Sequence, residues 1–316
     1  MCASSRTQVK CARFCLGGEM LESWVFWSLL AASMQSVRTA GQKVLTADVS
    51  PLGATLVRYL FGLPFIALYL GWLMTSRGYS LPVPNGTFLV YGIAAGFLQV
   101  VATILLIRLF ALRNFAVGSC YIRTEVLITA ILGLVLFAEV ISPMGWGAIV
   151  TCVVGLLMIT VAKTGRVSDL WNLSAVYGLG AGIAFSLTSL LIRQASLSFG
   201  IDDAMFTAAL TLCYMIIVQT LMCLAMLVYS NAGEIITVFR KWPTSVFIGL
   251  TSVIGSTGWF TAFTLERAAY VKTLGQIEFL LTLAISILYF KERPNPMEML
   301  GMVILVAGVV LLLLAP

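Results

Sequence analysis

The chain has 316 residues, of which 60% are hydrophobic and only 10% are charged, and its formal net charge is +6. A typical soluble domain is about a quarter charged, and it cannot bury so large an apolar fraction. This composition excludes a soluble globular protein and indicates that the lipid bilayer is the solvent. Histidine is absent, which excludes imidazole metal sites and catalysis of the Ser-His-Asp and Cys-His types.

The first 20 residues are polar and show no periodicity. They hold three basic residues but no apolar stretch of signal-peptide length. We therefore expect a disordered tail over residues 1–20. Met20 is a candidate start of the native chain, because the apolar pattern begins directly after it.

Ten apolar segments follow the tail. A helix needs about 20 residues to cross about 30 Å of hydrocarbon, and each segment meets that length. The breaks between segments are short and carry glycine, proline or charged residues. We therefore predict an all-α integral membrane protein with ten transmembrane helices, at residues 23–42, 52–74, 87–110, 116–138, 143–162, 173–195, 203–229, 244–265, 268–290 and 297–315.

The two halves of the chain align without a gap after a shift of 153 residues. Polar, proline and glycine positions then coincide: Glu125 with Glu278, Thr129 with Thr282, Glu139 with Glu292, Pro143 with Pro296, and Gly155 with Gly308. Each copy has five segments, an odd number, so the second copy enters the membrane from the opposite side. The pattern predicts two inverted five-helix repeats, with a substrate site between them near the middle of the membrane.

In these features the chain resembles the EamA family of the drug/metabolite transporter superfamily. The resemblance depends on Leu132 to Glu139 with Pro143 and Gly155, on Leu283 to Glu292 with Pro296, Gly301 and Gly308, and on Arg58 and Glu278. It implies repeats over residues 21–163 and 173–316. Segments one to four and six to nine then wall the cavity, and segments five and ten lie at the periphery. Val126 and Phe279 stand where the family usually has proline, which leaves helix kinking open at both points.

The resemblance implies that both chain ends are cytoplasmic, but the basic residues of the loops do not decide the orientation. Seven of them fall on the side of the termini, including three in the tail and Arg193, Arg267 and Lys272, against eight on the other side. Without the tail the counts are 7 − 3 = 4 and eight, which favours the reverse orientation.

Glu125 and Glu278 are the mirrored acidic residues within the apolar segments. Because a charged group inside the membrane is costly, each is a candidate for proton coupling or for binding a substrate amine. The alternative is a structural hydrogen bond between helices, through Thr129 or Thr282.

Five further residues complete the candidate site. Arg123 is suited to a carboxylate or phosphate, and its mirror Gln276 is suited to donating a hydrogen bond. Arg58 is expected to pair with Glu125, while Gln99 and Trp259 are candidates for lining the cavity. Arg38 and Arg108 lie nearer helix ends and are expected to extend toward the interface, and Glu139 and Glu292 are expected to be structural.

The resemblance and the inverted repeat together predict a secondary transporter, an exporter, of small polar or amphipathic metabolites that works by alternating access. The expected partners are a small-molecule substrate and the bilayer of a plasma membrane or bacterial inner membrane, and a homodimer is left open. No basic run suggests nucleic acid, and no cofactor or metal is expected. The alternatives are a flippase for lipid-linked head groups, in which Arg123 binds phosphate, and an integral membrane lipid transferase.

Overall fold

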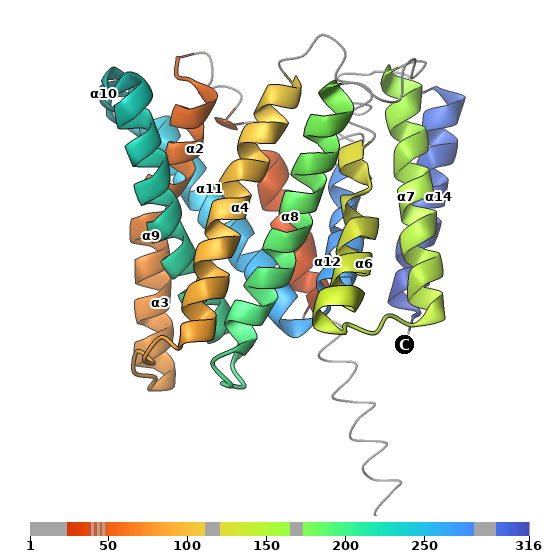
Figure 1. The fold of residues 1–316 in the computed structure, drawn as a ribbon, viewed down its shortest axis with the longest axis horizontal. Helices are drawn as coiled ribbons and strands as arrows, with labels where there is room; N and C mark the ends of the chain where they lie inside the picture. The colour runs from red at the N-terminus through yellow and green to blue at the C-terminus, as the bar shows by residue number, and fades with distance from the viewer. Residues whose placement is uncertain are drawn as a thin grey trace, which may run out of the picture.

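The computed structural model describes residues 24–38, 41–42, 45, 48–110, 121–164, 173–280 and 295–315, and all regular structure in these ranges is helical (Figure 1). Residues 24–38 form the first helix. It is followed by α2 (Pro51–Leu60), α3 (Leu63–Arg77), α4 (Gly86–Phe110), α6 (Glu125–Phe137), α7 (Pro143–Thr164), α8 (Leu173–Leu197), α9 (Ala204–Asn231), α10 (Gly233–Arg240), α11 (Trp242–Leu265), α12 (Ala268–Gly275) and α14 (Pro296–Leu313).

Within the described residues, 7 helical stretches are long and apolar enough to cross a membrane, and α6 is a shorter apolar helix. Large aliphatic side chains on these helices face outward, as at Leu68 (71% exposed) and Val303 (65%). Exposed apolar side chains over so many helices are suited to a lipid environment. The protein is therefore a multi-pass integral membrane protein. The predicted segments 23–42, 116–138 and 268–290, and the tail 1–20, lie partly or wholly outside the described residues.

Local sequence explains where several helices begin and end. Ser50 caps α2 by accepting a hydrogen bond from the Gly53 amide at 3.1 Å, and Pro51 occupies the first turn. The predicted segment 52–74 is a single stretch broken into α2 and α3, with Pro64 in the first turn of α3. Because proline lacks an N–H, it cannot continue the hydrogen-bond pattern of α2.

Helices α7 and α14 form a pair at one edge of the molecule (Figure 1), the peripheral place that the resemblance implies for segments five and ten. A Cβ added to Gly155 would lie 2.7 Å from the Gly301 carbonyl oxygen, and one added to Gly308 would lie 3.1 Å from the Ala148 carbonyl oxygen. These two contacts are equivalent under the shift of 153 residues. The Cys152 thiol also faces the carbonyl of Leu305, 153 residues away.

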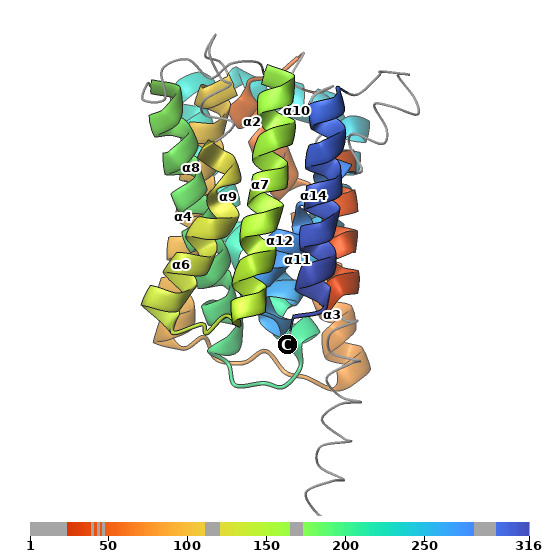
Figure 2. The same cartoon turned by 90° about the vertical axis from the view of Figure 1, so that its right-hand side faces the viewer.

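The helices run between two faces of the molecule. Figure 2 shows α7 rising from the face at which the chain ends, while α14 descends to that face, so the pair is antiparallel. We call this face the C-terminal face and the opposite one the α10 face, since α10 lies there (Figure 1). The short helix α10 is exposed to the outside at Ile236 and Phe239 and buried at Val238.

Candidate functional site

Both mirrored glutamates lie within two residues after an interruption of a helix. Residues 121–123 are helical, Thr124 forms a turn, and α6 begins at Glu125. In the second repeat α12 ends at Gly275, Gln276 forms a turn, and residues 277–280 resume the helix that carries Glu278. The interruptions therefore occupy almost equivalent positions, although neither repeat has a proline there.

Side chains at the interruptions satisfy backbone carbonyls. The Thr124 hydroxyl donates to the Tyr121 carbonyl at 2.6 Å, and the Gln276 amide donates to the Lys272 carbonyl at 3.1 Å. Such bonds allow a helix to be broken inside a membrane, where no water is at hand for the backbone. The Gln276 amide group that was expected to meet a substrate therefore has a backbone partner.

Glu125 forms an ion pair with Lys272, and their closest N–O distance is 2.5 Å. The two side chains are 16% and 17% exposed, so solvent reaches the pair. Glu125 occupies the first turn of α6, where the helix dipole favours a negative charge. The prediction that Glu125 pairs with Arg58 is wrong. Lys272 lies on α12, which packs against α6, whereas Arg58 lies on α2, which packs against α9 and α11.

Three aromatic rings surround the Lys272 ammonium group. Its nitrogen lies 5.6 Å from the ring centre of Trp259 and 5.9 Å from those of Phe263 and Phe185. Aromatic faces attract a cation at these distances, and more strongly where water is scarce. Lys272 is therefore held both by a carboxylate and by apolar surface.

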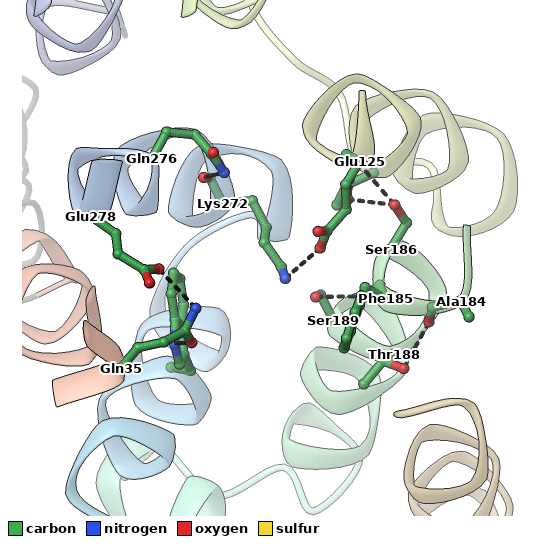
Figure 3. Close-up of polar contacts among 12 residues, drawn as sticks. Gln35, Glu125, Ala184, Phe185, Ser186, Thr188, Ser189, Lys272, Gln276 and Glu278 are labelled. Atoms are coloured by element: carbon green, nitrogen blue, oxygen red, sulfur yellow. Dashed lines mark hydrogen bonds and ion pairs between the residues drawn. The ribbon is translucent and has the colours of Figure 1, made fainter. Parts of the chain in front are cut away.

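Glu278 is connected to Trp259 through one intervening side chain. Gln35 donates to a Glu278 carboxylate oxygen at 2.8 Å and accepts from the Trp259 indole at 3.1 Å. Figure 3 shows Gln35 and Glu278 on one side of the site and Lys272 extending toward Glu125 on the other. We call Glu125, Lys272, Glu278, Gln35 and Trp259 the central site.

Arg123 joins the two repeats at the edge of the central site. Its guanidinium carbon lies 3.6 Å from the ring centre of Phe279, the residue that replaces the usual proline. The positive charges of Arg38, Arg123 and Lys272 all act on Glu278. Charged residues of each repeat thus contact the other repeat across the centre of the molecule.

A second polar group lies between α2, α4, α9 and α11. Gln219 donates to the Gln99 amide oxygen at 2.6 Å, and both residues line a cavity of about 10 Å³ together with Arg58. The structure therefore places Gln99 and Arg58 beside a cavity other than the central site.

An open cleft of about 430 Å³ lies on the C-terminal face. It is lined by Trp27 and Leu265 and by an ion pair between Arg77 and Asp203. Asp203 also caps α9 through the Phe206 amide, at 3.1 Å. One carboxylate therefore fixes the start of α9 and its contact with the end of α3.

Glu139 forms an ion pair at the same face. Its carboxylate pairs with Arg193 at 3.1 Å, and Arg193 also donates to the Phe263 and Glu266 carbonyls, both at 2.5 Å. Arg193 thereby neutralises the negative end of α11. Burial raises the pKa of the Glu139 carboxyl above its ordinary value, and the charges of Arg193 and Arg267 oppose only part of that effect. Its mirror Glu292 lies outside the described residues.

Sequence reasoning missed Lys272 and Gln35 as site residues. Lys272 was counted as a loop charge, although it falls inside the predicted segment 268–290. A lysine within an apolar segment, six residues before Glu278, is the signal that could have identified it. Gln35 offers no comparable signal, because its role depends on two residues more than 220 positions away.

Comparison with known families agrees with the duplicated architecture. The model of the EamA-like transporter family matches twice, over residues 22–161 and 172–314. The chain belongs to the EamA-like transporter family. The two matches confirm the internal duplication and the resemblance seen in the sequence, and membership identifies a family of transporters.

Solved structures support the fold. 28 chains of solved structures match, and one of them, described only as a crystal structure of a protein, superposes with a TM-score of 0.70. It is 14% identical and covers 93% of this chain and 98% of its own. At that identity the likeness shows the fold alone. No curated protein matches.

Proposed function

We propose that the protein is a secondary transporter, an exporter of the cell membrane, that moves small polar or amphipathic metabolites by alternating access. The observation that carries the proposal is the ion pair between Glu125 of one repeat and Lys272 of the other, in an interior that solvent reaches. Charges are costly within a membrane and are retained there mainly for function. A pair that joins two halves is suited to a process in which those halves move.

The architecture that we propose is ten spans in two inverted repeats. The family model matches each half once, and α7 and α14 are antiparallel and touch at equivalent residues. Both observations support a pseudo-two-fold relation between the halves. Inverted repeats of this kind rock around a fixed central site.

The central site is suited to a substrate with both charge and apolar surface. Glu125, Glu278 and Lys272 offer charges of both signs, and Trp259, Phe263 and Phe185 offer ring faces. A charged substrate group can replace one partner of the Glu125–Lys272 pair. The residue that stays in place then keeps an opposite charge beside it, which lowers the cost of separating the repeats.

Transport into proteoliposomes tests the proposal. Purified protein is reconstituted and supplied with a panel of labelled amines, carboxylates and zwitterions, and Lys272→Met and Glu278→Gln are compared with wild type. We expect accumulation of at least one compound by wild type and its loss in both variants. Asp48→Asn is the matched control, because Asp48 pairs with Lys241 at the α10 face, outside the central site.

Two outcomes would overturn parts of the proposal. Full transport by both central variants would remove the central site from the mechanism. Movement of a labelled lipid head group across the bilayer, with no metabolite transported, would favour the flippase. Proton coupling is tested in the same assay: if Glu278→Gln retains transport, an unchanged pH dependence would exclude Glu278 as the coupling residue.

A further inference from the structure

The cavity between α2, α4, α9 and α11 is small and is lined by both polar and apolar side chains. Its volume of about 10 Å³ admits one particle of about the size of a water molecule. Arg58 and Tyr59 from one repeat and Ser252 and Ser256 from the other contribute to its wall. The cavity therefore lies at the junction of the repeats but outside the central site.

Two hydroxyl groups at this cavity lack partners. The Tyr59 and Ser252 oxygens are buried and have no hydrogen-bond partner among the described residues. Each residue is only 2% exposed. Buried polar groups are nearly always hydrogen-bonded, because an unsatisfied one retains its full cost of desolvation. Two such groups at one cavity indicate that something occupies it.

The charge around the cavity is positive. Arg58 lines the cavity and forms no ion pair with any described residue, and the charge of Arg38 also acts on Arg58. Arg38 is itself buried, and its Nε has no partner in the described part of the chain. The acidic residue whose charge acts on Arg38 is Glu278. The positive charges of Arg123 and Lys272 also act on Glu278, so its one negative charge is divided among three basic residues.

Several polar groups at the cavity can donate a hydrogen bond into it. The guanidinium of Arg58 can only donate, and the hydroxyls of Tyr59 and Ser252 can each donate once. The Gln99 amide oxygen, an acceptor at this cavity, already accepts from Gln219 at 2.6 Å. A water molecule could bond to the two hydroxyls but would leave the charge of Arg58 without a counter-ion, and a cation would be repelled by Arg58.

We propose that this cavity is a binding site for one monatomic anion of the chloride class. Arg58 supplies the charge, and the Tyr59 and Ser252 hydroxyls supply two hydrogen bonds. The small volume of about 10 Å³ favours a monatomic ion over a carboxylate or phosphate group. The bound ion would tie α2 of the first repeat to α11 of the second and thereby stabilise the fold. The site is independent of the proposed transport function.

The first test is a halide titration of the purified full-length protein. Thermal unfolding is followed as sodium chloride or bromide replaces sodium gluconate at constant ionic strength. We expect a saturable rise in Tm with chloride and bromide, since a ligand that binds only the folded state stabilises it. An identical Tm in gluconate and chloride at all concentrations would overturn the proposal and leave a water molecule as the occupant.

Matched variants locate the effect. Tyr59→Phe and Ser252→Ala each remove one hydroxyl, and we expect the half-saturating chloride concentration to rise about tenfold in each. The controls are Tyr69→Phe and Thr261→Val, whose hydroxyls are also buried without partners but do not line the cavity. The proposal fails if the controls weaken the chloride effect as much as the two cavity variants do.

The second test needs no variant. Crystals of the wild-type protein grown in bromide should show an anomalous peak between the Arg58 guanidinium and the hydroxyls of Tyr59 and Ser252. If no peak appears at a bromide concentration that saturates the rise in Tm, the halide binds elsewhere and the assignment is overturned.

Discussion

Lys272 and Glu125 lie where an isolated charge is expensive. Each side chain retains some contact with solvent, yet apolar helices and aromatic rings surround the pair. Breaking a buried pair by removing one partner costs more than the pair itself contributes, because the remaining charge is left uncompensated. This asymmetry gives a stability test that is separate from transport.

We expect Lys272→Met to lower the free energy of unfolding by about 2–4 kcal/mol. This loss is at the lower end of the range for breaking a buried ion pair, because solvent reaches both side chains. The double variant Lys272→Met with Glu125→Gln should recover most of that loss, since no charge is then left alone. Unfolding in a denaturing detergent measures all three proteins, together with Glu125→Gln. Strictly additive losses would contradict the coupling of these residues.

Glu139 gives a pH-dependent prediction. Its pKa is raised above 4.5 by burial, so the folded state binds the proton more tightly than the unfolded chain does. The stability from this residue is present below the ordinary pKa and is lost as pH rises through the raised value. The Tm of wild type minus that of Glu139→Gln should therefore fall from about pH 4.5 upward. A difference that grows with pH would mean that pairing with Arg193 outweighs burial.

At the scale of elements, the two helix interruptions are built without proline. Local side chains, Thr124 in one repeat and Gln276 in the other, bond the carbonyls that the break exposes. Space is also restricted there, because a Cβ added to Gly275 would lie 2.2 Å from the Trp259 ring. The interruption in the second repeat and the position of Trp259 therefore depend on each other.

The pairing of α7 and α14 depends on glycine at two equivalent positions. A Cβ at Gly155 would lie 2.6 Å from the Leu305 amide nitrogen, and one at Gly308 would lie 2.6 Å from the Cys152 sulfur. We expect Gly155→Ala and Gly308→Ala each to cost about 1–3 kcal/mol, because the helices must separate. Thermal unfolding measures the loss.

Gly71→Ala is the control, since no atom lies within 4 Å of a Cβ there. It should be neutral or slightly stabilising, because alanine is the better helix former. A Gly155→Ala variant as stable as Gly71→Ala would contradict the close approach of the two helices.

At the scale of the whole molecule, the structure changes the charge count that bears on orientation. Arg193 lies within α8 and Lys272 lies within α12, and each forms an ion pair, so neither counts as a loop charge. The counts predicted from the sequence then become 7 − 2 = 5 basic residues on the side of the termini with the tail, or 4 − 2 = 2 without it, against eight on the other side. The positive-inside rule now favours the α10 face for the cytoplasm.

We therefore predict the opposite orientation to the one that the resemblance implied. Ser230, near the α10 face, and Ser80, at the C-terminal face, are both exposed. Each is replaced by cysteine in a background without the seven native cysteines, and intact cells are treated with a maleimide that cannot cross the membrane. Ser80→Cys should react and Ser230→Cys should not. The reverse pattern, or equal labelling of both, would contradict the prediction.

Hydropathy and periodic spacing determined much of this protein at the level of sequence. They predicted a helical membrane protein, a duplication and the mirrored pair Glu125 and Glu278, because membrane insertion depends on local composition and a repeat is a property of the chain itself. The count of ten spans and their inversion remain predictions. The number of apolar segments says nothing of where one helix breaks.

Only the tertiary structure decided which charged groups meet. Lys272 and Glu125 are 147 residues apart, and Gln35 and Glu278 are 243 apart. No local pattern selects such partners, because contact depends on which helices pack together and on how each is rotated about its axis. For the same reason Arg58, which sequence reasoning paired with Glu125, lies instead at the small cavity between α2, α4, α9 and α11.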